Sequence, residues 1–144
     1  MTAERPVASP EVRDARVRAV LSIALHRFLG VELLDADRPE TGIWFDVGAA
    51  AQNQAALLHG GVVTALLDVA CFLALLPQLS QAQHAVTHDL SVSLLRPVPA
   101  GSRVELTGQV LRRGRAVAFL RAEAHVDGRL VATAQVTKTV LVIA

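Results

Sequence analysis

The segment from residue 53 to residue 77, NQAALLHGGVVTALLDVACFLALLP, constrains the fold more than any other part of this chain. After His59 and two glycines, the run is apolar except for Thr64 and Asp68. No proline interrupts it before its last residue, so it predicts a helix over about residues 60–76. A helix that is apolar nearly all round belongs in the centre of a soluble fold. It is too short for a typical membrane span, which needs about 20 residues.

Asp68 is the one carboxylate of this segment, and two interpretations of it stay open. A buried carboxylate is costly unless it gains partners or a proton, which makes Asp68 a functional candidate. Alternatively, it caps a loop or faces water at the helix edge. The upstream His59, Gly60 and Gly61 favour the functional interpretation, because backbone N–H groups at a helix N-terminus stabilise a developing oxyanion. A carboxylate together with an oxyanion donor indicates acyl transfer.

The spacing of Gly60 and Asp68 has a consequence for assembly. Eight positions on one helix place them about 12 Å apart along the axis, at 1.5 Å per residue. A reacting carbonyl must lie about 3 Å from both groups. If both act on one carbonyl, they come from two chains, and the hypothesis predicts a homodimer with two symmetry-related sites.

Composition excludes several classes of function and partner. A net charge of +1 gives no general electrostatic case for binding nucleic acid or a membrane. A hydrophobic content of 52% and a mean hydropathy of +0.41 favour an oligomer, in which more apolar surface is hidden. A single cysteine suits a reducing cytosol, and the N-terminus shows no signal pattern, so we expect a cytoplasmic protein. No dinucleotide or phosphate-loop fingerprint is present.

The rest of the chain predicts an α+β fold. Residues 1–10 are expected to form a flexible tail and residues 11–144 one domain. Ser9 and Pro10 are typical of a helix start, which predicts a helix over residues 11–29 ended by Gly30. Strands are predicted over residues 31–34, 43–47, 85–95, 103–111, 116–126 and 130–142, with a hairpin turn at Asp127-Gly128. One long helix followed by such a meander indicates an antiparallel sheet wrapped around the helix.

The strand over residues 85–95 alternates regularly. Val86, His88 and Leu90 are predicted on one face, and Thr87 and Asp89 on the other. His84 and His88 are four residues apart, which on a strand separates them by some 13 Å at about 3.3 Å per residue. They are therefore not expected to share a metal ion.

The motif N-x5-H-G-G-x6-D, formed by Asn53, His59 to Gly61 and Asp68, resembles that of the PaaI-like acyl-CoA thioesterases of the hotdog fold. The downstream T-x-D-L and L-R-P patterns extend this similarity over about residues 30–142. The resemblance implies that the Gly60 N–H binds the thioester carbonyl and that Asp68 of the other subunit acts as nucleophile or general base. It further implies that Asn53 orients the reacting groups and that Thr87 assists the attacking water.

The chain departs from that family at two positions. The family often has proline after the asparagine and glycine three residues before the histidine, where this chain has Gln54 and Ala56. The loop that carries Asn53 is therefore expected to run differently. His59 itself is either catalytic or structural, fixing the loop so that the Gly60 N–H points at substrate.

Three arginines, Arg112, Arg113 and Arg115, surround a glycine turn. They form either a solvated hairpin tip or a clamp for the phosphates of coenzyme A, for which the planar guanidinium is suited. Arg96 is a second candidate for the same contact.

The sequence therefore predicts an acyl-CoA thioesterase that hydrolyses aryl- or medium-chain acyl-CoA without metal or cofactor, with the acyl group near Phe72. We expect either a homodimer or a homotetramer formed as a dimer of dimers. Replacing Asp68 by Asn is expected to leave the fold intact and to lower kcat by orders of magnitude. The alternatives are a non-catalytic module that binds acyl thioesters and a hydroxyacyl-thioester dehydratase.

Overall fold

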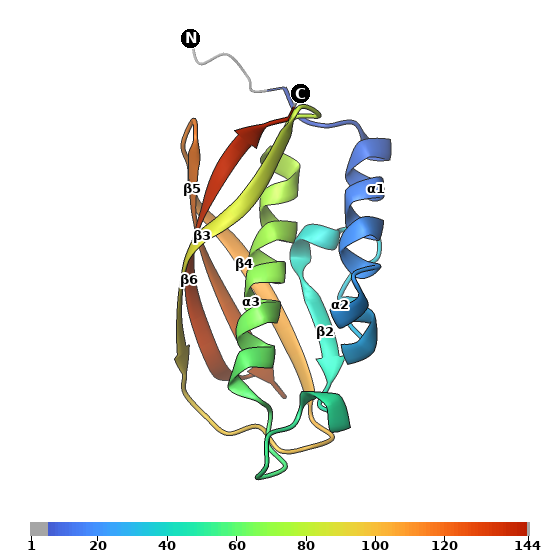
Figure 1. Cartoon of the computed structure of the whole chain (residues 1–144), viewed down its shortest axis with the longest axis vertical. Coiled ribbons are helices and arrows are strands. Elements are labelled where there is room, and N and C mark those ends of the chain that lie inside the picture. The colour runs from blue at the N-terminus through green and yellow to red at the C-terminus, as the bar shows by residue number, and fades with distance from the viewer. Residues whose placement is uncertain (1–5, 144) are drawn as a thin grey trace.

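The computed structural model describes residues 6–143, whose strands form one six-stranded antiparallel sheet. The strand order is β1-β2-β4-β5-β6-β3, which puts the long strand β3 at an edge. The strands are β1 Glu32–Leu33, β2 Ile43–Asp46, β3 Gln83–Leu94, β4 Arg103–Arg113, β5 Val117–Val126 and β6 Arg129–Val142. The helix α3, Gly60–Leu75, runs along one face of this sheet, which curves around it (Figure 1). The predicted hotdog architecture is confirmed.

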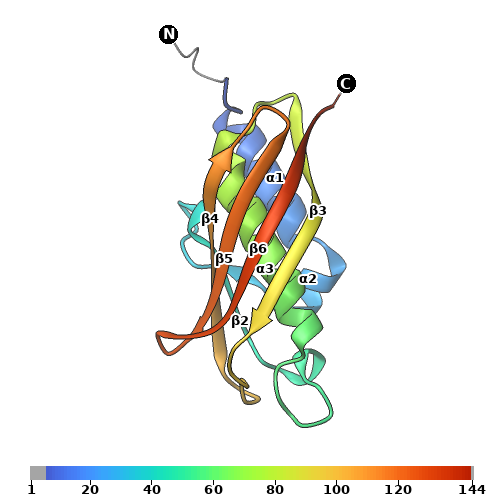
Figure 2. The same ribbon diagram turned by 90° about the vertical axis from the view of Figure 1, so that its left-hand side faces the viewer.

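The helix α3 packs directly on strand β4. Leu66, Leu67 and Cys71 on its inner side are fully buried against the sheet. On β4, Gly108 faces the helix, and a Cβ atom there would lie 2.5 Å from the Ala70 carbonyl oxygen. Because no other residue leaves that space, glycine at this position sets the depth at which α3 packs. The view from the sheet side shows α3 behind the strands (Figure 2).

The same helix is apolar enough to resemble a membrane span. With the following 3₁₀ turn it covers Gly60–Gln78, 19 residues of mean hydropathy 2.0, and among the described residues it is the one helix that meets that length and composition. Half of it is buried inside the fold. Since strands β3, β4, β5 and β6 all pack on it, we interpret it as the core helix of the domain.

The prediction of one N-terminal helix over residues 11–29 is wrong, because the structure has two. Helix α1 spans Pro10–Leu21 and helix α2 spans Ala24–Leu29. The predicted ends are correct: the Ser9 hydroxyl accepts a hydrogen bond from the Val12 N–H at 3.3 Å. Gly30 ends α2 in the left-handed region, with φ 71°.

The break between α1 and α2 has a local cause. The Ser22 hydroxyl donates to the Arg18 carbonyl at 2.6 Å, and Ile23 is extended with ψ 132°. His26, which is buried, then contacts the Val20 carbonyl oxygen through Nδ1 at 2.7 Å. The His26 ring nitrogen thus binds the Val20 carbonyl oxygen. In a continuous helix that oxygen would accept a hydrogen bond from the N–H four residues later. Helical spacing alone does not reveal such a competing partner.

The predicted N-terminal tail of residues 1–10 lies partly outside the described residues. Within the described part, the Ala8 N–H donates to the Leu79 carbonyl at 3.0 Å, just after α3. Pro10 is already the first residue of α1. The chain is therefore attached to the fold from Ala8 onward.

The predicted alternation of strand β3 is wrong for its first half. A β-bulge shifts the register against β6 between Thr87 and Asp89, so His88 is an extra residue. Before the bulge, the buried Ala85 shows that odd-numbered positions face α3; after it, Leu90 and Val92 pack on the core. A bulge re-aims side chains in this way. It turns Thr87 toward the helix, where strict alternation had placed it on the opposite face from Leu90.

Candidate active site

Three polar side chains meet beneath the middle of α3: Asp68 from the helix, Thr87 from β3 and Lys138 from β6. The Thr87 hydroxyl donates to Asp68 Oδ1 at 2.6 Å. Lys138 Nζ donates to the same Oδ1 at 2.8 Å and to Thr87 Oγ1 at 2.6 Å. The β3–β6 register pairs Thr87 directly with Lys138, which brings their side chains side by side under the helix. We call these residues the Asp68 cluster.

The direction of each hydrogen bond in the Asp68 cluster follows from the groups involved. An ammonium group only donates hydrogen bonds, so Thr87 Oγ1 must accept a hydrogen bond from Lys138, and its own hydroxyl hydrogen is donated to Asp68. The hydroxyl keeps a second lone pair for a further donor. Both hydrogen bonds to the carboxylate fall on Oδ1, which leaves Oδ2 without a hydrogen bond among the described residues. The cluster can thus accept two hydrogen bonds from a bound water, one at Thr87 Oγ1 and one at Asp68 Oδ2.

The two charges of the cluster differ in their access to solvent. The Lys138 side chain is 3% exposed and the Asp68 side chain 32% exposed. The ammonium is therefore fixed inside the protein, where it needs the carboxylate as a partner. The carboxylate opens into a cavity of about 720 Å³.

This cavity, which we call the Asp68 cavity, lies between the N-terminal helices and α3. Its walls are mostly apolar side chains of α1, α3 and β3, with Arg16, His26 and His84 as further polar lining residues, and Phe72 stands beside His84 with ring centroids 5.7 Å apart. The lining residues include Ala19, Val20, Ile23, Ala65, Val69 and Phe72. An apolar cavity with a few convergent polar groups is the usual form of a small-molecule site.

The N-terminus of α3 holds the second part of the predicted site. His59 precedes the helix, and its Nδ1 accepts a hydrogen bond from the Gly61 N–H at 2.9 Å. Among the described residues, nothing accepts from the Gly60 N–H. His59 thus caps the helix, and it satisfies one amide while leaving the other available to an oxyanion. A catalytic role for His59 stays a prediction.

Asn53 organises the loop in front of this helix end. Its Oδ1 accepts from the N–H groups of Ala55 at 2.9 Å and Leu57 at 3.2 Å. Ala56, at the position where glycine was expected by resemblance, adopts φ 57° in the left-handed region. The loop therefore makes its turn without the glycine. Asn53 and Gly60 line a common hollow of about 260 Å³, the Gly60 hollow.

The predicted site residues thus fall into two groups within one chain. Asp68 and Thr87 are in contact, and His59, Gly60 and Asn53 lie together at the helix start. Gly60 and Asp68 both belong to α3, so about 12 Å along the axis separates them. Each lines a different cavity.

The arginine turn, which carries Arg112, Arg113 and Arg115 between β4 and β5, lies at the opposite end of the molecule from the start of α3. It is beside the C-terminal end of α3 (Figure 1). Arg113 is buried, and its guanidinium donates to the carbonyl oxygens of Gly114 and Arg115 and to Gln83 Oε1 at 3.4 Å. These contacts give Arg113 a part in holding the turn. Arg112 and Arg115 are exposed. Contact of these three side chains with coenzyme A phosphates stays a prediction.

The Cys71 thiol is not placed for catalysis. Burial raises the pKa of the Cys71 thiol to about 12, so it stays protonated and unreactive near neutral pH. Within residues 6–143, no three metal-binding side chains come together.

Sequence reasoning missed Lys138, although two signals mark it. It is the only lysine of a chain that otherwise uses arginine. It also falls in step with Ala134, Val136 and Val140, which form the buried face of β6. A lone lysine at a core-facing position requires a buried acid nearby. Asp68, which the sequence had already identified as a candidate buried carboxylate, is that acid.

Comparison with known proteins identifies the family of this chain. The family model described as Thioesterase superfamily matches residues 56–133. A medium/long-chain acyl-CoA thioesterase from Salmonella typhimurium is 31% identical over 129 residues, covering 77% of this chain and 81% of the relative.

Two solved structures share the fold of this chain. The phenylacetic acid degradation protein PaaI from Thermus thermophilus, solved in a mutant form, is 29% identical, with a TM-score of 0.70, covering 78% of this chain and 95% of that one. A Bacillus halodurans protein solved with CoA shares the fold at 21% identity, with a TM-score of 0.76 over 91% of this chain and 84% of the other. With its fold, its His-Gly-Gly helix start and its helical aspartate, the chain belongs to the thioesterase superfamily, as a hotdog-fold member of the PaaI-like type.

Proposed function

We propose that this protein hydrolyses acyl-CoA thioesters to the free acid and coenzyme A at sites built jointly by two protomers. The observation that carries the proposal is the Asp68 cluster: a carboxylate fixed by Thr87 and Lys138 that opens into an apolar cavity. The Gly60 N–H, which has no acceptor in the described part of the chain, lies at the start of the same helix and supplies the second half of the chemistry.

Two protomers are needed because one chain separates these halves by about 12 Å. Strand β3 is a 12-residue edge strand, and Val86 and Leu94 on it are 40% and 57% exposed. A long unpaired edge of this kind is suited to pairing with a second copy. Pairing two copies of β3 brings each α3 start toward the partner's Asp68 cluster. Exposed Leu111, Phe119 and Leu141 elsewhere on the sheet favour a further contact, giving a dimer of dimers.

The reaction follows from the geometry. The Gly60 N–H of one protomer polarises the thioester carbonyl and stabilises the oxyanion. A water held between Thr87 Oγ1 and Asp68 Oδ2 of the other protomer donates one hydrogen bond to each, which points its lone pair at the carbonyl carbon. As the C–O bond forms, Asp68 takes one water proton. The C–S bond then breaks, and the proton passes to the departing thiolate, so acyl-CoA and water give acid and thiol.

General-base action by Asp68 is favoured over direct attack. Lys138 and Thr87 both bind Oδ1, which fixes the carboxylate and leaves Oδ2 and a Thr87 lone pair to hold a water between them. A water held there is the attacking group, and Oδ2 is in place to receive its proton. One turnover in H₂¹⁸O, with enzyme in excess, separates the two routes. A general base places ¹⁸O in the acid product of the first turnover, whereas a mixed anhydride of Asp68 that water opens at the Asp68 carboxyl carbon places ¹⁶O in the acid and ¹⁸O in Asp68.

The Asp68 cavity, about 720 Å³ and apolar, favours medium-chain or aryl acyl groups. The name of the Salmonella relative, a medium/long-chain acyl-CoA thioesterase, supports the same class. A cytoplasmic location accords with acyl-CoA as substrate and stays a prediction.

The decisive experiment is a panel of acyl-CoA esters varied in chain length and aromaticity, assayed for thiol release. We expect turnover with aryl or medium-chain esters and its loss in the Asp68→Asn variant. Binding without thiol release across the panel would instead identify a non-catalytic module. Hydration of an enoyl-CoA, followed spectroscopically, would identify a dehydratase.

A further inference from the structure

The wall of the Asp68 cavity includes a charged side chain that the proposed reaction does not use. Arg16, on helix α1, lines the same cavity as Asp68. Its Nη2 donates to three carbonyl oxygens at and just before the start of β3: Ser80 at 3.2 Å, Gln81 at 3.0 Å and Gln83 at 2.7 Å. These contacts fix the guanidinium beside the first residues of the strand.

The other terminal nitrogen of Arg16 has no acceptor. Nη1 is buried, and it makes no hydrogen bond within residues 6–143. No carboxylate in the described part of the chain forms an ion pair with Arg16. Asp68 is the one carboxylate among the described lining residues, and Lys138 already binds it at 2.8 Å. Because a guanidinium stays protonated in proteins, the cavity holds a positive charge without a counter-charge.

Arg16 and Asp68 are held at different positions along strand β3. Thr87 binds Asp68, whereas the Gln83 carbonyl binds Arg16. Four residues of strand separate Gln83 from Thr87 by about 13 Å. An acyl chain whose carbonyl lies at the Asp68 cluster therefore needs medium length for its far end to reach the guanidinium.

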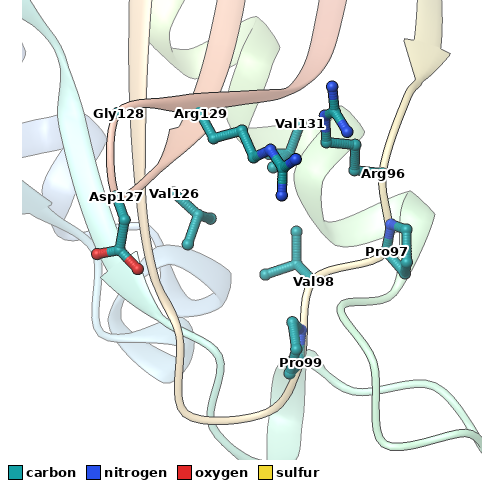
Figure 3. Close-up of a pocket in the computed structure, with 9 residues that line it drawn as sticks. All are labelled: Arg96, Pro97, Val98, Pro99, Val126, Asp127, Gly128, Arg129 and Val131. Carbon is teal, nitrogen blue, oxygen red and sulfur yellow. The ribbon is translucent and has the colours of Figure 1, made fainter.

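The other large arginine-lined surface does not reach this cavity. A groove of about 630 Å³ between Arg96 and Arg129 shares lining residues with the Gly60 hollow, at the start of α3 (Figure 3). It shares no lining residue with the Asp68 cavity. Arg16 is the one arginine among the described residues that line the Asp68 cavity.

We infer that the Asp68 cavity selects acyl groups that end in a carboxylate, the CoA monothioesters of medium-chain dicarboxylic acids, and that Arg16 binds this carboxylate. The inference rests on the proposed thioesterase function and names the substrate class of its acyl cavity. Arginine binds carboxylates through charge-assisted hydrogen bonds, which are stronger than neutral ones. A terminal carboxylate gives the buried Nη1 an acceptor and the cavity its missing anion. A methyl-ended chain supplies neither, so it leaves a buried donor unsatisfied.

Three thioesters of equal chain length test the inference: suberyl-CoA with its free terminal carboxylate, the terminal methyl ester of suberyl-CoA, and octanoyl-CoA. For the wild-type protein, we expect kcat/KM for suberyl-CoA to be about tenfold above that for its methyl ester, mainly through KM. In Arg16→Gln this order should reverse, because the carboxylate then enters the cavity without a cation to bind it. Octanoyl-CoA turnover should change far less. Glutaryl-CoA, whose chain is too short to reach Arg16, should gain nothing over its own methyl ester.

Arg18→Gln is the matched control, because Arg18 is an exposed arginine of the same helix that does not line the cavity. Arg129→Gln is a second control, in the groove of Figure 3. Both should keep the wild-type ratio of kcat/KM between suberyl-CoA and its methyl ester.

A wild-type ratio near one would overturn the inference, whatever the variants do. So would an Arg16→Gln variant that loses activity equally on all three thioesters, as expected if Arg16 only holds α1 in place. If Arg16→Gln loses structure by circular dichroism, the wild-type ratio alone decides. Thiol release from octanoyl-CoA without any preference for the free carboxylate contradicts the inference and leaves the proposed function intact. Release from no thioester at all contradicts the proposed function instead.

Discussion

Asp68 and Lys138 depend on each other, which changes how either residue can be probed. Lys138 is buried, and Asp68 is its one carboxylate partner in the described structure. The Asp68→Asn variant therefore removes a catalytic group and also leaves a buried ammonium without its counter-charge. Contrary to the expectation from sequence, we predict a loss of about 1–3 kcal/mol in unfolding free energy, moderated by the partial exposure of Asp68. Urea denaturation measures this loss, and wild-type stability would contradict it.

A double variant separates the two consequences. Asp68→Asn/Lys138→Met replaces the ion pair by a neutral pair, so we expect it to regain part of the stability that Asp68→Asn loses. Its kcat should stay low, by about 10²–10⁴-fold, because the proton acceptor is still missing. Lys138→Met alone keeps the carboxylate, so it should retain more activity than Asp68→Asn or the double variant. If activity returned in the double variant, Asp68 would not be the base.

At the scale of elements, the packing of α3 on β4 depends on Gly108. We predict that Gly108→Ala lowers the unfolding free energy by about 1–3 kcal/mol, because its Cβ would meet the Ala70 carbonyl at 2.5 Å and push the helix outward. Gly48→Ala is the control, since its backbone has φ −80° and no atom lies within 4 Å of the added Cβ. Equal unfolding curves for the two variants would show that the helix adjusts freely.

The elements also mark how far sequence reasoning reached. Helix α3, its start at Gly60 and the strands that surround it were predictable, because apolar periodicity and capping residues are local signals. The break after Leu21 and the bulge at His88 were not. The first depends on His26 competing for a carbonyl, and the second on register against β6. Thr87 was assigned by resemblance, but only the bulge explains why it reaches Asp68.

At the scale of the whole molecule, the central question is which chains supply Gly60 and Asp68 to one site. Gly60→Pro removes the N–H at the first helical position, where proline is favoured. His59 before it is already extended, with ψ 126°, as a residue preceding proline requires. A side chain at position 60 first meets Leu94 Cδ1, the flexible end of a leucine. Gly60→Ala keeps the N–H and is therefore the steric control.

Mixed dimers then decide the matter. If each site joins Gly60 of one chain to Asp68 of the other, a Gly60→Pro chain paired with an Asp68→Asn chain contains one intact site. Such heterodimers, isolated with two affinity tags, should recover about half of wild-type kcat, although both parent homodimers are nearly inactive. Pairing a chain that carries both substitutions with a wild-type chain should give no active site at all. Sites confined to single chains predict the reverse in both experiments, because the first heterodimer would have none intact and the second would have one.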